Sequence, residues 1–163
     1  MSLEKLKEQV KSYYPVEPDW RVLEKAWDFA VAAHQGQKRF SGELYITHPE
    51  GVAHILAELE LDIDTIVAGL LHDVVEDTDV SLEEIKTEFS AEIAMLVDGV
   101  TKLSKLEYKS KEEHQAENLR KMFIAMAKDI RVLLIKLADR THNMRTLKYL
   151  SSIKQQSISR ETL

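Results

Sequence analysis

Apolar side chains recur at intervals of three and four residues along most of this sequence, and no segment alternates convincingly with period two. That spacing lines up one face of a helix. In the segment 20–33 it is shown by Val22, Leu23, Ala26, Trp27, Ala30 and Ala33. Only 5 Gly and 3 Pro occur among 163 residues, which leaves little material for the turns of an all-β fold. The pattern therefore predicts an all-α protein, built as a compact multi-helix bundle.

Capping residues divide the chain into predicted helices. The helix over residues 20–33 should end near Gly36, and Pro49 should open the next, capped by Thr47 with Glu50 or by His48. Further starts are predicted at Asp62 or Asp64, at Ser81 with Glu84 (ending near Phe89), before Ile93, at Ser110 with Glu113 (running to Lys128), and at Asp129 (running to Leu150). The helix capped by Asp62 or Asp64 is expected to continue through residues 70–78. The lysine-rich run 102–111 is expected to be a solvated loop.

Length and charge limit the class of protein. A chain of 163 residues fits one globular domain, so residues 1–163 are taken as a single domain. No apolar run reaches the ~20 residues of a membrane helix, and no secretion signal follows the start, so we expect a cytoplasmic protein without a membrane partner. The net charge of -6 argues against a nucleic-acid partner. With 0 Cys, disulfides and thiolate metal sites are excluded.

The segment LLHDVVEDT, residues 70–78, places a histidine and three carboxylates among Leu and Val, with no Lys or Arg nearby in the sequence. On a regular helix of ~100° per residue, His72, Asp73, Glu76 and Asp77 lie on one face and the apolar residues on the other. Such a stripe is ordinarily a solvated acidic face. A partly buried, ionised carboxylate instead needs a partner, a proton or a metal. A bound metal would supply the missing positive charge.

A second polar stripe follows near the end of the chain. Asp139, Asn143 and Thr146 are spaced i, i+4, i+7, which puts them on one helix face. They can be solvated, or they can provide one metal ligand and two hydrogen-bonding groups in a cleft. Imidazoles combined with carboxylates suit Mn²⁺, Fe²⁺ or Zn²⁺ better than an all-oxygen Ca²⁺ site. Sequence spacing alone does not show that the two segments converge.

Four stretches resemble a known family. His48, His72 with Asp73, and Asp139 match the H…HD…D signature of the HD phosphohydrolase superfamily. The segments RFSGELYITHP (39–49), HDVVEDT (72–78), VDGVTKL (97–103) and LADRTHNMRT (137–146) resemble the N-terminal hydrolase domain of RelA/SpoT-type bifunctional alarmone enzymes. The resemblance extends from about residue 22 to the last residue. It implies an HD-domain bundle that is an N-terminal fragment of a longer protein. The synthetase domain would lie outside the chain, and the absence of the following helices would favour self-association.

The resemblance also implies an activity and residue roles. The enzyme would be a guanosine-3′,5′-bis(diphosphate) 3′-pyrophosphohydrolase of the stringent response, converting ppGpp or pppGpp to GDP or GTP plus pyrophosphate with one divalent metal, Mn²⁺. By matching positions, the metal ligands would be His48, His72, Asp73 and Asp139. The acidic pair needed for turnover would be Glu76 and Asp77, and the nucleotide would contact Arg39, Asn143 and Thr146.

Departures from the family pattern leave two alternatives open. Phe40 stands where a Lys is common, Leu44 replaces a Pro, and Thr141 replaces a Leu. The chain could be a catalytically silent nucleotide-binding module that regulates an alarmone synthetase, or an HD phosphohydrolase for other nucleotides. The intact HD and ED motifs favour activity. His34, His54, His114 and His142 are the remaining histidines, and none is assigned to the site. His34 and His54 are interpreted as surface or packing residues. His142 is left out because it points about 60° away from Asp139 on the helix.

Overall fold

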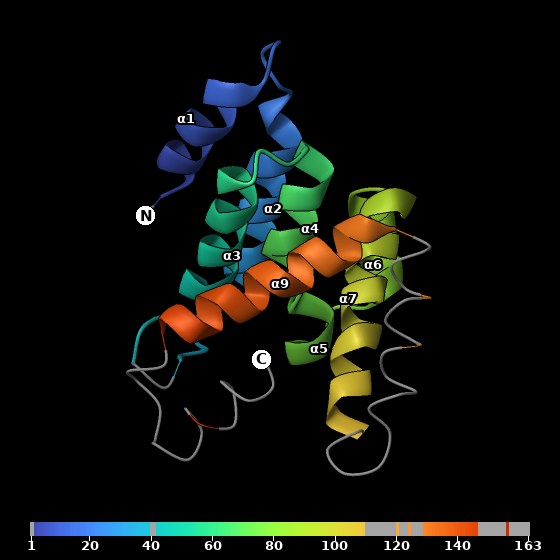
Figure 1. Cartoon of the computed structure of the whole chain (residues 1–163). Helices are drawn as coiled ribbons and strands as arrows, with labels where there is room; N and C mark the ends of the chain where they lie inside the picture. The colour runs from blue at the N-terminus through green and yellow to red at the C-terminus, as the bar shows by residue number, and fades with distance from the viewer. Residues whose placement is uncertain are drawn as a thin grey trace.

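Helices form nearly all of the regular structure, as the apolar periodicity predicted (Figure 1). The computed structural model describes residues 2–39, 42–109, 120, 124, 129–146 and 156, with only the backbone for 106–109. Its helices are α1 (Leu3–Tyr13), α2 (Trp20–Ala33), α3 (Thr47–Glu58), α4 (Ile63–Leu71), α5 (Val74–Asp77), α6 (Leu82–Glu88), α7 (Ala91–Lys109) and α9 (Ile130–Arg145). Within those residues the only β pairing is one isolated bridge between Lys38 and Leu44.

Helix α4 occupies the centre of the bundle. Every residue from Thr65 to Leu71 is buried, and α4 packs against α2, α3, α7 and α9. Helix α9 crosses α3, α4 and α7 (Figure 1). A helix that is apolar on all sides needs neighbours on all sides, which explains why α4 is surrounded. This arrangement brings the start of α3, the end of α4 and the second half of α9 to one place.

Glycines allow close approach at the helix crossings. A Cβ on Gly99 of α7 would lie 2.7 Å from Cγ2 of Val132 in α9. A Cβ on Gly69 of α4 would lie 2.5 Å from Cδ1 of Leu56 in α3. Both distances are far below van der Waals contact, so a larger residue at either position would force the facing side chain or the helix to shift.

We expect Gly99→Ala to lower the free energy of unfolding by about 1–2 kcal/mol. Alanine gains about 1 kcal/mol of helix propensity, but its methyl group overpacks against the stiff, β-branched Val132. Urea unfolding followed by circular dichroism measures the difference. Met95→Ala, at a half-exposed position of the same helix, is the control and should change stability little. A Gly99→Ala protein more stable than the wild type would contradict the close crossing.

Most predicted helix starts are confirmed. Ser81 and Glu84 form the reciprocal capping box before α6. Asp62 accepts from the Thr65 amide at the start of α4, and Asp129 accepts from the Arg131 amide at the start of α9. Each cap satisfies a backbone N–H that has no partner inside the helix.

Two local predictions are wrong, and one helix was not predicted. Thr47 is the first residue of α3 rather than its cap, and its hydroxyl donates to the carbonyl of Leu44. The run 102–109 continues α7 rather than forming a loop. Helix α1 was not predicted at all, although Ser2 caps it and Leu6 and Val10 bury its inner face. The expectations for Phe40, for the helix start at Ser110 with Glu113, for residues 113–128 other than Arg120 and Ile124, and for the continuation of α9 through residues 147–150 lie outside the described residues.

The most consequential difference is a break in the helix predicted through residues 70–78. Helix α4 ends at Leu71, His72 and Asp73 form a turn, and α5 begins at Val74. The Nδ1–H of His72 donates to the carbonyl oxygen of Gly69 at 2.6 Å. That carbonyl is the acceptor that the next helical amide would use, so the side chain competes with the helix for it. His72 and Asp73 keep right-handed helical dihedral angles through this turn.

No helix in the described part of the chain combines the length and the apolar character needed to cross a lipid bilayer.

Candidate metal centre

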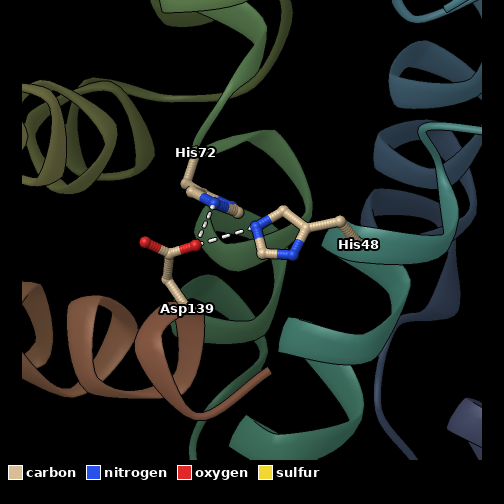
Figure 2. A group of neighbouring side chains, drawn as sticks. All are labelled: His48, His72 and Asp139. Atoms are coloured by element: carbon tan, nitrogen blue, oxygen red, sulfur yellow. Dashed lines mark hydrogen bonds and ion pairs between the residues drawn. The ribbon is translucent and has the colours of Figure 1, made fainter. Parts of the chain in front are cut away.

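Four predicted metal ligands meet where α3, α4 and α9 converge. Figure 2 shows His48 from α3, His72 from the end of α4 and Asp139 from α9 pointing toward one another. Oδ1 of Asp139 lies 2.8 Å from Nε2 of His48 and 3.5 Å from Nε2 of His72. Oδ2 of Asp73 completes the group, 3.1 Å from Nε2 of His72 and 3.5 Å from Nε2 of His48.

The protonation of His72 indicates that this cluster is built for a cation. Because its Nδ1 donates to the Gly69 carbonyl, a neutral His72 carries a lone pair on Nε2. That nitrogen is buried and has no hydrogen-bond partner among the described residues. It faces carboxylate oxygens of Asp73 and Asp139, which are also electron-rich. Such a group of acceptors is stable only around a positive charge. His48, His72 and Asp139 have the geometry to hold a metal ion.

In the metal-free protein a proton takes the place of that positive charge. Burial alone would lower the pKa of His72, but the charges of Asp73 and Asp139 outweigh burial and hold it well above its ordinary value. Burial would raise the pKa of Asp73, but His72 and His48 lower it to about 2. In the same way His48 and His72 overcome burial and hold the pKa of Asp139 well below its ordinary value.

These pKa shifts predict pH-dependent metal binding. A cation competes with the proton on His72, so Mn²⁺ affinity should rise with pH until the raised pKa of His72 is passed. Below that pH, binding should release about one proton. Calorimetry in two buffers of different ionisation enthalpy counts the protons. Equal heats in both buffers at neutral pH would contradict the prediction.

The same shifts set the pH range in which the metal-free fold is stable. The raised pKa of His72 stabilises the fold below the ordinary histidine pKa, and this contribution is lost as the pH rises through the raised value. The lowered pKa values of Asp73 and Asp139 stabilise the fold above the ordinary aspartate pKa. This stabilisation is lost as the pH falls through the lowered values. The stabilisation by added metal should therefore be largest at alkaline pH.

Two further side chains hold the carboxylates, and the sequence interpretation missed both. The hydroxyl of Tyr45 lies 2.8 Å from Oδ2 of Asp73 and 2.9 Å from Oδ2 of Asp77. The ammonium of Lys136 donates to Oδ2 of Asp139 at 3.2 Å and to the hydroxyl of Ser104 at 2.9 Å. Lys136 precedes Asp139 by three residues on α9, a spacing that already places both on one helix face. A protein cation therefore does reach the acidic cluster, from another helix.

The acidic pair on α5 lies at the edge of the cluster. Burial, followed by the charges of Asp73 and Asp77, raises the pKa of Glu76. Burial and the charge of Asp73 raise the pKa of Asp77, against the effect of its hydrogen bond with Tyr45. Both side chains are exposed, but within the described residues Tyr45 contacts Asp77, whereas Glu76 makes no hydrogen bond to another side chain.

The predicted nucleotide-contacting residues gather beside the cluster. The guanidinium of Arg39 lies 3.4 Å from Oδ1 of Asn143 and 3.4 Å from Oγ1 of Thr146. Its other terminal nitrogen, Nη1, lies 3.1 Å from Nδ1 of His142. The interpretation of His142 as a residue outside the site is therefore wrong, because it contacts both Arg39 and the cluster residue His48. His34 and His54 are buried packing residues, as expected.

Comparison with known proteins identifies similarity along most of the chain. Residues 26–163 match the HD domain family. The GTP pyrophosphokinase of Myxococcus xanthus is 57% identical over 157 residues, covering 94% of this chain and 21% of the relative. The bifunctional (p)ppGpp synthase/hydrolase SpoT of Escherichia coli K12 is 53% identical over 160 residues, covering 98% and 23%. The guanosine-3′,5′-bis(diphosphate) 3′-pyrophosphohydrolase of Vibrio cholerae is 54% identical over 154 residues, covering 94% and 22%. The chain thus spans about a fifth of the length of these relatives.

A solved structure shares the fold. It is described as a metazoan ortholog of SpoT that hydrolyzes ppGpp and plays a role in starvation responses. The alignment has a TM-score of 0.68 and 29% sequence identity, and covers 91% of this chain and 85% of the other. The convergence of α3, α4 and α9 therefore occurs in a helical architecture that a characterised hydrolase also uses.

Proposed function

Because this chain belongs to the HD-domain family, we propose that it hydrolyses guanosine 3′,5′-bis(diphosphate) or its pentaphosphate form to GDP or GTP plus pyrophosphate. The observation that carries the proposal is the cluster of His48, His72, Asp73 and Asp139, whose electron-rich atoms face one another beside Arg39. Relatives named for this reaction, and for synthesis of the same nucleotide, support the choice of substrate.

The proposed ligands are His48, His72, Asp73 and Asp139, and the proposed ion is Mn²⁺. When bound, a divalent cation supplies Lewis acidity and lowers the pKa of water, so that attack on phosphorus becomes possible at neutral pH. In the proposed step, the water oxygen bonds to the phosphorus attached to the ribose 3′ oxygen. The bond from that phosphorus to the 3′ oxygen breaks, and pyrophosphate leaves.

Glu76 is proposed to move the proton. Its raised pKa is closer to neutrality than that of an ordinary glutamate, as a general base requires. Glu76 takes the proton of the attacking water and returns it to the ribose 3′ oxygen as the bond from that oxygen to phosphorus breaks. Asp77 is proposed to have a positioning role, since the hydroxyl of Tyr45 links it to Asp73.

Arg39 is proposed to bind the phosphates. Its guanidinium is half-buried and is held on one side by His142, Asn143 and Thr146. A guanidinium binds phosphate oxygens in a planar, bidentate geometry, and fixing it beforehand lowers the entropy lost on binding. The protein as a whole carries a charge of -6, so an anionic substrate depends on such a local cation.

The test is metal-dependent product release by the wild-type chain. The protein is stripped with a chelator, dialysed, and assayed with guanosine 3′,5′-bis(diphosphate) before and after addition of Mn²⁺, with GTP as a control nucleotide. We expect equimolar pyrophosphate and GDP only with Mn²⁺, and no pyrophosphate from GTP. A folded, Mn²⁺-bound chain that releases no pyrophosphate would overturn the proposal and favour a silent regulatory module.

A further inference from the structure

The contact between Arg39 and His142 fixes where the hydrogen of His142 lies. A guanidinium only donates hydrogen bonds, so Nδ1 of His142, 3.1 Å from Nη1 of Arg39, must accept. An accepting ring nitrogen carries a lone pair and no hydrogen. A neutral His142 therefore carries its hydrogen on Nε2.

The same nitrogen also determines the tautomer of His48. Nδ1 of His48 lies 2.8 Å from Nδ1 of His142, and two nitrogens at this distance share one hydrogen. Since Nδ1 of His142 carries none, Nδ1 of His48 must donate. Nε2 of His48 lies 2.8 Å from Oδ1 of Asp139, and a carboxylate oxygen only accepts, so a hydrogen on Nε2 joins these two atoms. A cation bound there would replace that hydrogen, and the one hydrogen of a neutral His48 would then lie on Nδ1, where Nδ1 of His142 accepts it.

We propose that His142 is a positioning residue, which orients His48 and holds it in the tautomer that presents Nε2 to a metal ion. This inference rests on the proposed metal site. The role corresponds to that of the Gly69 carbonyl, which accepts from Nδ1 of His72 and leaves Nε2 of that ring facing the carboxylates. Both imidazoles of the cluster are thus fixed through their outer nitrogens.

The ring of His142 packs directly against the backbone of α3 at Gly51, where there is no side chain. A Cβ on Gly51 of α3 would lie 2.2 Å from Cδ2 and 2.4 Å from Nε2 of His142. The ring therefore occupies the space that any other residue at position 51 would fill. Gly51 lies three residues after His48 on α3, and His142 lies on α9. Their contact therefore joins the two helices next to the cluster.

Arg39 contacts both His142 and the proposed nucleotide-binding residues. Its Nη1 contacts His142, and its Nη2 contacts Asn143 and Thr146. The guanidinium of Arg39 thus contacts His142, which orients His48, and also Asn143 and Thr146 near the end of α9. Loss of His142 should affect both the metal ion and the placement of Arg39.

The tautomer of His142 can be measured directly in the wild-type protein. Long-range ¹H–¹⁵N spectra of the metal-free chain are recorded at neutral pH, where the lowered pKa of His142 keeps this imidazole neutral. We expect its one hydrogen on Nε2. A hydrogen on Nδ1 of His142 would overturn the proposal, whatever the variants show.

Substitutions test the positioning role through Mn²⁺ affinity, measured by electron paramagnetic resonance without any nucleotide. His142→Leu removes the acceptor and should weaken Mn²⁺ binding about 10- to 100-fold, as loss of an outer-shell partner does. His142→Asn places an amide oxygen near the original Nδ1 position and should restore most of the affinity. Equal affinities of the leucine variant and the wild type would overturn the proposal, as would an asparagine variant as weak as the leucine variant.

Gly51→Ala provides a second test at a position outside the cluster. Alanine favours a helix interior over glycine, so the substitution alone should not unfold the protein. Its methyl group should displace the ring of His142 and weaken Mn²⁺ binding. An unchanged Mn²⁺ affinity would contradict the proposal that the position of His142 controls the metal site. Because these experiments measure metal binding, a wild-type chain that binds Mn²⁺ but releases no pyrophosphate would refute the proposed function and leave the role of His142 intact.

Discussion

Asp73→Ala is expected to reduce kcat/KM for Mn²⁺-dependent pyrophosphate release by at least about 10³-fold. The substitution removes the carboxylate oxygen that lies 3.1 Å from Nε2 of His72 and 3.5 Å from Nε2 of His48. Two imidazoles and one carboxylate would remain for the ion, and the hydrogen bond from Tyr45 would lose its acceptor on this side. A cation in a catalytic site stabilises the developing charge by several kcal/mol, and each 1.36 kcal/mol lost costs about tenfold in rate.

The effect must be separated from loss of the fold. Asp28→Ala is the control. It removes an aspartate side chain at an exposed position of α2 that is not part of the cluster, and it should leave activity unchanged. Circular dichroism shows whether the Asp73→Ala chain is folded, and electron paramagnetic resonance shows whether it holds Mn²⁺. A folded Asp73→Ala protein with wild-type Mn²⁺ affinity and wild-type turnover would remove Asp73 from the site.

Sequence reasoning located the cluster because its residues lie in short, dense motifs. Helical periodicity predicted the elements on which His48 and Asp139 lie, and capping residues predicted the starts of α4, α6 and α9. Convergence of segments separated by about 90 residues does not follow from spacing. It followed from the family resemblance, and the packing of α9 across α3 and α4 gives its physical basis.

The sequence interpretation failed where a side chain overrides the regular backbone or where two helices meet. A continuous helix would place His72 and Asp73 about 100° apart. In the structure the helix ends at Leu71, where Nδ1 of His72 bonds to the Gly69 carbonyl, and Nε2 of His72 lies 3.1 Å from Oδ2 of Asp73. His142 was set aside on its angle from Asp139, but that angle says nothing of what lies on the adjacent helix. A glycine at position 51 was the available signal, since it leaves room for a ring from another element.

Glu76→Gln is expected to lower kcat about 10²- to 10⁴-fold while Mn²⁺ affinity stays close to that of the wild type. Glutamine keeps the size of the side chain but cannot accept the proton of the attacking water. Glu76 lies at the edge of the cluster and is not one of the proposed metal ligands. The loss should therefore appear in kcat, measured at saturating substrate, rather than in metal binding.

Asp77→Asn is the matched variant that distinguishes the two acidic residues. Its amide oxygen can still accept from Tyr45, so we expect a smaller loss of kcat than for Glu76→Gln. Tyr45→Phe removes the hydroxyl that joins Asp77 to Asp73 and should resemble Asp77→Asn rather than Glu76→Gln. If Asp77→Asn instead had the larger effect on kcat with Mn²⁺ binding intact, the proton would move through Asp77, and the exposed Glu76 would serve another purpose. Both outcomes leave the proposed metal ligands in place, because neither carboxylate is among His48, His72, Asp73 and Asp139.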